Sequence, residues 1–244
     1  MSTRATATVA TCVAAVACLL ATVARAQPRG GPPEPPASAR QSAAIDLTGQ
    51  WVSIVNEDWR WRVITPPKGD YTSVQPLNAA GRAVADQWDP SQDGSCRAYG
   101  AAGLMRMPTR LRIDWDGDDV LTVRTDAGEQ LRRFEFAPKD DAGAPSLQGH
   151  SVATWHHTLR PAGARGGPQP PGGSLEVVTT RLTPGWLRKN GVPYSADTKL
   201  TEHFDRFAAP SGDEWLVVTT IVEDPQYLNG RFITSSHFRR EKDR

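Results

Sequence analysis

The sequence predicts an all-β protein, a single antiparallel β-barrel with one short helix. Downstream of about residue 45, apolar and polar residues alternate with a period of two in most segments. Turn-forming residues interrupt this alternation roughly every ten positions, as between the strands of a barrel or sandwich. The segment 45–242 is also long enough to enclose one core, because all-β domains of about 200 residues are common. We therefore place a single barrel domain at residues 45–242.

Turn dipeptides locate the first predicted hairpins. Asp116-Gly117 lies between the apolar stretches 111–114 and 120–125. Both central residues of such a turn readily take positive φ, so a tight hairpin is expected there. The sequence Asp126-Ala-Gly128 leads in the same way into a strand at 131–136.

A repeated tetrapeptide and a capped helix complete the predicted elements. Val-Val-Thr-Thr occurs at 177–180 and at 217–220, each time inside a β-branched run typical of strands. Asn78 can cap a helix over 79–88, which Asp89-Pro90 ends. The Pro- and Gly-rich segment 161–173 has predicted strands on both sides, and we interpret it as a long loop within one domain.

The N-terminal 26 residues predict a cleavable signal peptide. Arg4 gives the positive start, residues 5–23 are mostly small and apolar, and Ala24-Arg25-Ala26 has the pattern that signal peptidase accepts. Cleavage after Ala26 would make the protein periplasmic or secreted. Residues 27–44 are rich in Pro, Gly and Ala and predict a flexible tether. A retained membrane helix or a lipid anchor is the weaker interpretation, so no stable membrane insertion is expected.

Charge and cysteine content exclude other classes. The whole chain has a net charge of +1, and loss of Arg4 and Arg25 with the signal makes the remainder slightly acidic. Such a balance gives no argument for nucleic-acid binding. Cys96 would be the one cysteine left, so the fold has no internal disulfide and depends on its core.

Several short motifs occur together between residues 96 and 240. They are Gly149-His-Ser-Val152 with Trp155, Gly191-Val-Pro-Tyr-Ser-Ala-Asp197, Thr201-Glu202 with Phe204, and Asp224-Pro225. As a set they resemble a large group of uncharacterised secreted proteins of soil bacteria. The resemblance implies export and an acidic residue at the position of Glu202, but no established reaction. The chain departs from the group's pattern at Trp155-His156-His157, where the group has an acidic turn, and at Tyr194, where it has His.

Gly49-Gln-Trp51 opens the first predicted strand, and Arg239 or Arg240 ends the last one. This pattern resembles lipocalin-like β-barrels, in which such an Arg packs on the Trp. The resemblance implies a barrel interior that can hold one small ligand.

Glu202 is the first candidate for acid/base chemistry. On a strand over 200–207 it shares a face with Leu200, Phe204 and Arg206. If that face points inward, burial would raise the pKa of Glu202 and suit it to general acid or base catalysis. The alternative is a Glu202–Arg206 pair on a solvated face.

Other candidates complete a possible enzyme site. His150 and Tyr194 could assist Glu202, Asp197 could join His150 and Ser151 in a hydrolase arrangement, and Arg106 or Arg206 could hold an anion. A serine hydrolase is the weaker hypothesis, because Gly-x-Ser-x-Gly is absent and adjacent strand residues face opposite sides. No spacing typical of a metal site or a cofactor motif occurs.

Tryptophan is over-represented, with 8 residues against 4 Tyr and 6 Phe. Alternation over 57–64 places Trp59 and Trp61 on one face of a predicted strand, and Trp155 follows the Gly-His-Ser-Val motif. With Arg106 and Arg206 they form the predicted ligand-binding set. We therefore expect a barrel cavity that binds a small apolar or aromatic molecule without a cofactor. The alternatives are a cofactor-free lyase, isomerase or hydratase in the same cavity, and a structural envelope protein without a ligand; the oligomeric state stays open.

Overall fold

The computed structural model describes residues 37–242 except 75, 90, 92–98, 139–142 and 159–171. The predicted signal peptide, the first part of the predicted tether, Cys96 and most of the loop expected at 161–173 lie outside the described residues.

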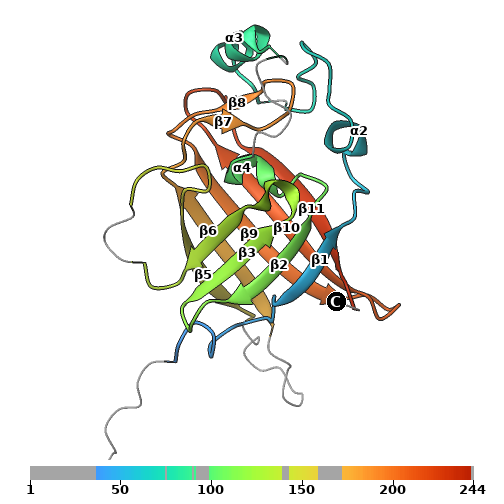
Figure 1. Ribbon diagram of the computed structural model, residues 1–244, viewed down its shortest axis with the longest axis vertical. Helices are drawn as coiled ribbons and strands as arrows, with labels where there is room; N and C mark the ends of the chain where they lie inside the picture. The colour runs from blue at the N-terminus through green and yellow to red at the C-terminus, as the bar shows by residue number, and fades with distance from the viewer. Residues whose placement is uncertain are drawn as a thin grey trace, which may run out of the picture. The chain divides into compact units, whose positions relative to one another are not determined.

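Nine strands close into one barrel (Figure 1). In chain order they are β1 (Gly49–Ser53), β2 (Arg110–Trp115), β3 (Val120–Thr125), β4 (Leu131–Glu135), β5 (His150–His157), β6 (Gly173–Thr180), β9 (Lys199–Ala208), β10 (Glu214–Glu223) and β11 (Phe232–Arg240). Around the barrel the order is β1, β11, β10, β9, β6, β5, β4, β3, β2. Neighbours are antiparallel except β4 and β5, which pair in parallel at Phe134–Ser151 and Glu135–Val152. The predicted fold class, a single all-β barrel, is confirmed.

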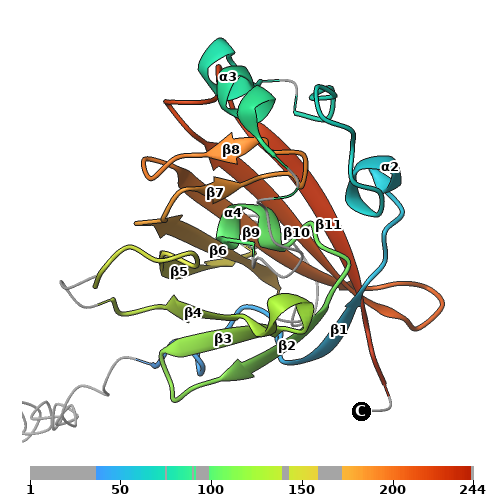
Figure 2. The ribbon, with the colours of Figure 1, turned by 45° about the horizontal axis from the view of Figure 1, so that its top comes forward.

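A group of short elements forms a cap at one end of the barrel. They are α3 (Ala79–Gln87), α4 (Ala101–Leu104) and the two-stranded sheet of β7 (Gly185–Trp186) and β8 (Pro193–Tyr194). Figure 2 shows α3 on the far side of β7 and β8 from the barrel strands. Two further short helices are α2 (Trp59–Arg62) and η1 (Ala127–Glu129).

The helix predicted after Asn78 is confirmed as α3. The Asn78 side chain accepts a hydrogen bond from the Gly81 N–H at 2.8 Å, which satisfies one of the donors exposed at a helix start. The hairpin at Asp116-Gly117 is also confirmed, because β2 and β3 pair antiparallel around it and Gly117 has a φ of 77°.

The strand predicted over 57–64 is wrong. Residues 59–62 form α2 instead, and the Trp59 side chain is 56% exposed. Tertiary contacts explain the difference, since the buried Arg62 Nε donates to the Arg106 carbonyl oxygen at 2.9 Å and its guanidinium pairs with Glu57. The helix turns Arg62 toward these partners and leaves Trp59 in solvent.

The compact unit that contains the barrel begins at Ala37, before the predicted boundary at residue 45. Ala39 N–H donates to the Asp119 carboxylate at 2.9 Å, and its carbonyl oxygen accepts from Trp155 Nε1 at 2.9 Å. The end of the predicted tether therefore packs on the barrel.

The inward-facing side chains form three layers along the barrel. One apolar cluster surrounds Trp51, Phe134, Phe204 and Phe238. A second apolar cluster lies at the cap end. Between them, alternation places a buried polar layer made of Arg132, Ser151, Thr179, Glu202, Thr220, Thr234 and Ser236.

The Arg-on-Trp contact expected from the opening motif forms with Arg240. Its guanidinium carbon lies 5.4 Å from the Trp51 ring centre, and its Nη2 donates to the Thr48 carbonyl oxygen at 2.7 Å. This stacking joins the first and last strands of the barrel, which pair at Trp51 and Arg240.

Candidate functional site

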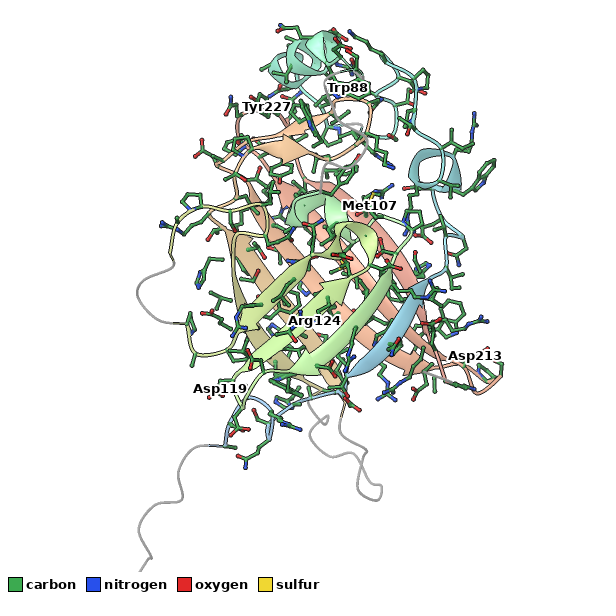
Figure 3. The ribbon with its side chains drawn as sticks, in the orientation of Figure 1. Trp88, Met107, Asp119, Arg124, Asp213 and Tyr227 are labelled. Atoms are coloured by element: carbon green, nitrogen blue, oxygen red, sulfur yellow. The ribbon has the colours of Figure 1, made fainter. Side chains whose placement is uncertain are left out.

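The cap encloses a pocket of about 450 Å³, which we call the cap pocket. Its volume lies within the range typical of small-molecule sites. Aromatic and apolar side chains dominate its lining, which consists of Val84, Tyr99, Gly100, Leu147, Thr183, Pro184, Gly185, Trp186, Pro193, Tyr194 and Tyr227. Tyr227 and Trp88 lie at the cap end of the barrel, whereas Asp119 and Asp213 lie at the other end (Figure 3). None of the residues of the barrel's polar layer lines this pocket.

Tyr194 contributes a buried hydroxyl to the lining of this pocket. The residue is fully buried, and its hydroxyl has no hydrogen-bond partner among the described residues. Burial raises the pKa of Tyr194 to about 12, so the phenol stays protonated at neutral pH and can donate a hydrogen bond. A buried hydroxyl without a partner costs about 1–3 kcal/mol, which a ligand acceptor would offset.

Two glycines make room for the Tyr194 hydroxyl. A Cβ on Gly100 would overlap the Tyr194 oxygen, and a Cβ on Gly185 would lie 2.6 Å from it. Gly100 starts α4 and Gly185 starts β7, so the hydroxyl lies between two cap elements. The cap therefore holds this phenol in a slot that larger residues would fill.

Asp224 fixes the backbone around the cap pocket. The carboxylate of Asp224 accepts hydrogen bonds from Ser195 N–H at 2.6 Å, Ser195 Oγ at 3.0 Å and Thr198 Oγ1 at 2.9 Å. It also accepts from the N–H of Tyr227 at 3.1 Å. One buried carboxylate thus connects the residue after Tyr194 to the segment that carries Tyr227. The sequence analysis did not select Asp224, although it belongs to the Asp-Pro motif.

The predicted hydrolase arrangement of His150, Ser151 and Asp197 does not form. Asp197 is exposed, and its N–H donates to Ser195 Oγ at 3.2 Å. His150 lies on the outward face of β5, 3.5 Å from the Glu135 carboxylate, whereas Ser151 points inward and contacts Thr179 Oγ1 at 2.8 Å. Adjacent strand residues face opposite sides here, as the sequence argument required.

Glu202 points into the barrel, but its partner is not Arg206. Both Glu202 oxygens accept from Arg132, at 3.0 Å from Nη1 and 2.6 Å from Nη2, and both side chains are fully buried. Arg206 lies near the end of β9, partly exposed, and pairs with Glu214. The alternative of a solvated Glu202–Arg206 pair is therefore wrong.

The bidentate pair restricts the chemistry open to Glu202. A proton on either oxygen would remove an acceptor from Arg132 and leave a guanidinium charge buried without its counter-charge. The Arg132–Glu202 pair also reaches Thr179, whose Oγ1 accepts from Arg132 Nη2 at 3.2 Å. Both oxygens of Glu202 are therefore engaged as acceptors within the polar layer. Tyr194, in the apolar cluster at the cap end, and outward-facing His150 lie outside that layer.

The predicted ligand-binding residues are dispersed. Trp59 is exposed on α2, and the Trp61 side chain lies outside what the structure describes. Trp155 stacks on Phe136 with 5.3 Å between ring centres and lines an open hollow with Asp119, at the end away from the cap. Arg106 is buried beside α4, with Nη2 3.2 Å from Asp58. None of these predicted residues lines the cap pocket.

No group of three or more His, Cys, Asp or Glu residues suited to a metal ion occurs among the described residues. No helix in the described part of the chain is long and apolar enough to cross a membrane.

Fold and site together define a closed β-barrel with a capped aromatic pocket. No protein-family model matches the chain. No solved structure matches it significantly either. A stretch of 83 residues, 34% of the chain, is 35% identical to the mouse (Mus musculus) protein Pleckstrin homology domain-containing family G member 5. That match spans 8% of the mouse protein's length.

Proposed function

We propose that the protein binds a small apolar or aromatic molecule in the cap pocket, with Tyr194 donating a hydrogen bond to an acceptor on the ligand. The carrying observation is the conjunction of an aromatic pocket of about 450 Å³ with a buried phenol that has no partner among the described residues. Tyr99, Trp186 and Tyr227 offer flat surfaces for an aromatic body. A ketone, ether or ester oxygen on that body would satisfy the Tyr194 hydroxyl.

This proposal moves the expected site from the barrel interior to the cap. Inside the barrel, the Glu202 carboxylate already accepts hydrogen bonds from Arg132. The cap pocket has space for a ligand and contains the Tyr194 hydroxyl, which has no partner among the described residues. Loops and short elements on a rigid barrel are common positions for binding sites. We also propose that binding takes place in the periplasm or outside the cell, on the evidence of the signal-like first 26 residues.

A matched ligand pair tests the proposal. Fluorenone and fluorene have the same flat three-ring shape, but only fluorenone has a carbonyl oxygen. We expect wild-type protein to bind both, with fluorenone roughly 2- to 12-fold tighter, since a net hydrogen bond is worth about 0.5–1.5 kcal/mol. Calorimetry measures both affinities, and quenching of the total tryptophan fluorescence, to which Trp186 in the pocket contributes, checks them.

Tyr194→Phe should remove the preference for fluorenone and leave fluorene binding unchanged. Tyr71→Phe is the matched control, because Tyr71 Oη donates to Asp86 at 2.6 Å and does not line the cap pocket. The proposal is wrong if neither compound binds saturably. It is also wrong if the fluorenone preference survives in Tyr194→Phe.

A further inference from the structure

Three buried arginines line a second, smaller pocket beside α4. They are Arg62 at the end of α2, Arg106 just after α4 and Arg188 just after β7, and we call them the arginine cluster. The side chains of Arg62 and Arg106 are 0% and 5% exposed, and Arg188 is similarly buried. Arginine is rarely buried without paired charges, so three at one pocket require an account of their counter-charges.

Two described carboxylates lie beside the arginine cluster. Glu57 pairs with Arg62 and also lies 3.0 Å from His237 Nδ1. Asp58 pairs with Arg106 at 3.2 Å, but its side chain is 51% exposed, so solvent weakens that pair. The pocket wall adds Lys189, a further cationic residue.

Burial and the closeness of like charges lower the pKa values of two arginines of the cluster. Burial, followed by the nearby Arg106 charge, lowers the pKa of Arg188 to about 9. Burial and the same neighbour lower the pKa of Arg62 to about 10. Cations that destabilise one another in this way favour the approach of an anion.

Arg106 has unused donors in this pocket. Its Nε and Nη1 are buried and have no hydrogen-bond partner among the described residues, while Nη2 donates to Asp58. The side chain is held by the contact of its guanidinium with the Phe232 ring, 5.8 Å from the ring centre. Two N–H directions of a fixed, buried guanidinium are thus available to an acceptor.

The size of the pocket limits what can enter. The pocket is partly open to solvent and has about 20 Å³ of interior space, so roughly one or two oxygens of an anion can enter it while the rest of the group stays at its mouth. The charged end of a molecule fits this space, whereas a whole nucleotide or aromatic ring does not.

We propose that the arginine cluster is a binding site for an oxyanion group, the carboxylate, phosphate or sulfate end of a small molecule. Charged hydrogen bonds from Arg106 would bind its oxygens, and Arg62 and Arg188 would supply the surrounding positive field. The proposal does not depend on the cap pocket, although Tyr99 lines both pockets.

Titration with inorganic phosphate at constant ionic strength tests this site. Affinity is measured by calorimetry, and the side-chain Nε–H resonances of Arg62, Arg106 and Arg188 are followed by NMR. We expect saturable binding that shifts the Arg106 resonance. Arg106→Gln should weaken binding at least tenfold, whereas Arg231→Gln, which changes an arginine that is 65% exposed, should leave it unchanged.

Asp58→Asn gives an opposite and independent prediction. It removes the carboxylate that competes for Arg106, and Asn accepts the left-handed backbone of this position, where φ is 48°. Phosphate should therefore bind at least threefold more tightly to Asp58→Asn than to wild type. This exposed substitution keeps the test decisive even where Arg106→Gln fails to fold.

Acetate, titrated in parallel, identifies the favoured group. Tighter binding of acetate indicates a carboxylate ligand, and tighter binding of phosphate indicates a tetrahedral oxyanion. Absence of saturable binding of both anions to wild type would overturn the proposal. So would equal phosphate affinities for wild type and Asp58→Asn.

Discussion

The buried Arg132–Glu202 pair makes a strong prediction about stability. Both side chains are fully buried, and two hydrogen bonds of 3.0 and 2.6 Å connect them. Removal of one member leaves an uncompensated charge inside the barrel, which costs about 3–5 kcal/mol. We expect Arg132→Met and Glu202→Leu each to destabilise the protein by this amount. That is a large part of the roughly 5–15 kcal/mol that stabilises a typical domain.

The double variant should behave differently from either single variant. Arg132→Met combined with Glu202→Leu leaves no charge to desolvate, and such replacements are neutral or stabilising by about 1–4 kcal/mol. The free energies of unfolding from urea titration, followed by tryptophan fluorescence, give the coupling between the two sites. We expect the second substitution to restore the free energy of unfolding that the first substitution lowered.

Arg133→Met is the matched control for this cycle. Arg133 lies on the same strand but points outward, and its pair with Asp116 has side chains 47% and 58% exposed. Its loss should change the free energy of unfolding by less than about 1 kcal/mol. A loss below 1 kcal/mol in Arg132→Met, or a double variant less stable than both single variants, would refute this account of the polar layer.

Three further predictions concern the space beside Tyr194, the titration of Tyr194, and the pair of Glu214 with Arg240. Gly100→Ala places a Cβ on the Tyr194 hydroxyl, so it should cost about 1–3 kcal/mol in urea unfolding and abolish fluorenone binding, whereas Gly230→Ala, with open space around it, should do neither. Relative to Tyr194→Phe, wild type should lose stability as the pH rises from 10 toward 12, because the pKa of Tyr194 is about 12 when folded and 10 when unfolded; melting curves of the two proteins measure this difference, to which Tyr71, with a similarly raised pKa, contributes equally in both. Hydrogen bonding from Arg240 lowers the pKa of Glu214 below 4.5. The stability it contributes is therefore complete above about pH 4.5 and is lost as the pH falls through the folded pKa; Glu214→Gln should lower the melting temperature at pH 7, and the gap should close in acid.

The sequence predicted those parts of the fold that local chemistry determines. Hairpin turns at Asp116-Gly117 and the Asn78 cap depend on a few adjacent residues, and both are found. The strand predicted at residues 59–62 was wrong because two tryptophans alternate there with the period of a strand. Arg62 donates a hydrogen bond to the Arg106 carbonyl oxygen, 44 positions away in the sequence. The local residue pattern contains no information about that contact.

The candidate site was less predictable for the same reason. Alternation placed Glu202 on one face with Leu200 and Phe204 but left open whether that face points inward. Its partner Arg132 is 70 positions away on a strand that is not its neighbour in the barrel. A signal did exist, because Arg132 alternates with Phe134 at positions that face inward on β4. The cap pocket had no comparable signal, since its walls come from segments between residues 84 and 227 that only the closed barrel brings together.

The polar layer and the cap pocket are connected through the register of β9. A shift of one residue would turn Glu202 outward and place His203 inside. Arg132 would then lose the carboxylate that neutralises its buried charge, so the Arg132–Glu202 pair stabilises the observed register. The same register fixes the start of β9, where Thr198 and Ser195 meet Asp224. Since Ser195 directly follows Tyr194, we infer that the buried ion pair helps hold the cap phenol in its slot. We therefore expect Glu202 to act as a positioning residue for Tyr194, a role different from the acid/base role that its isolated position on one strand first indicated.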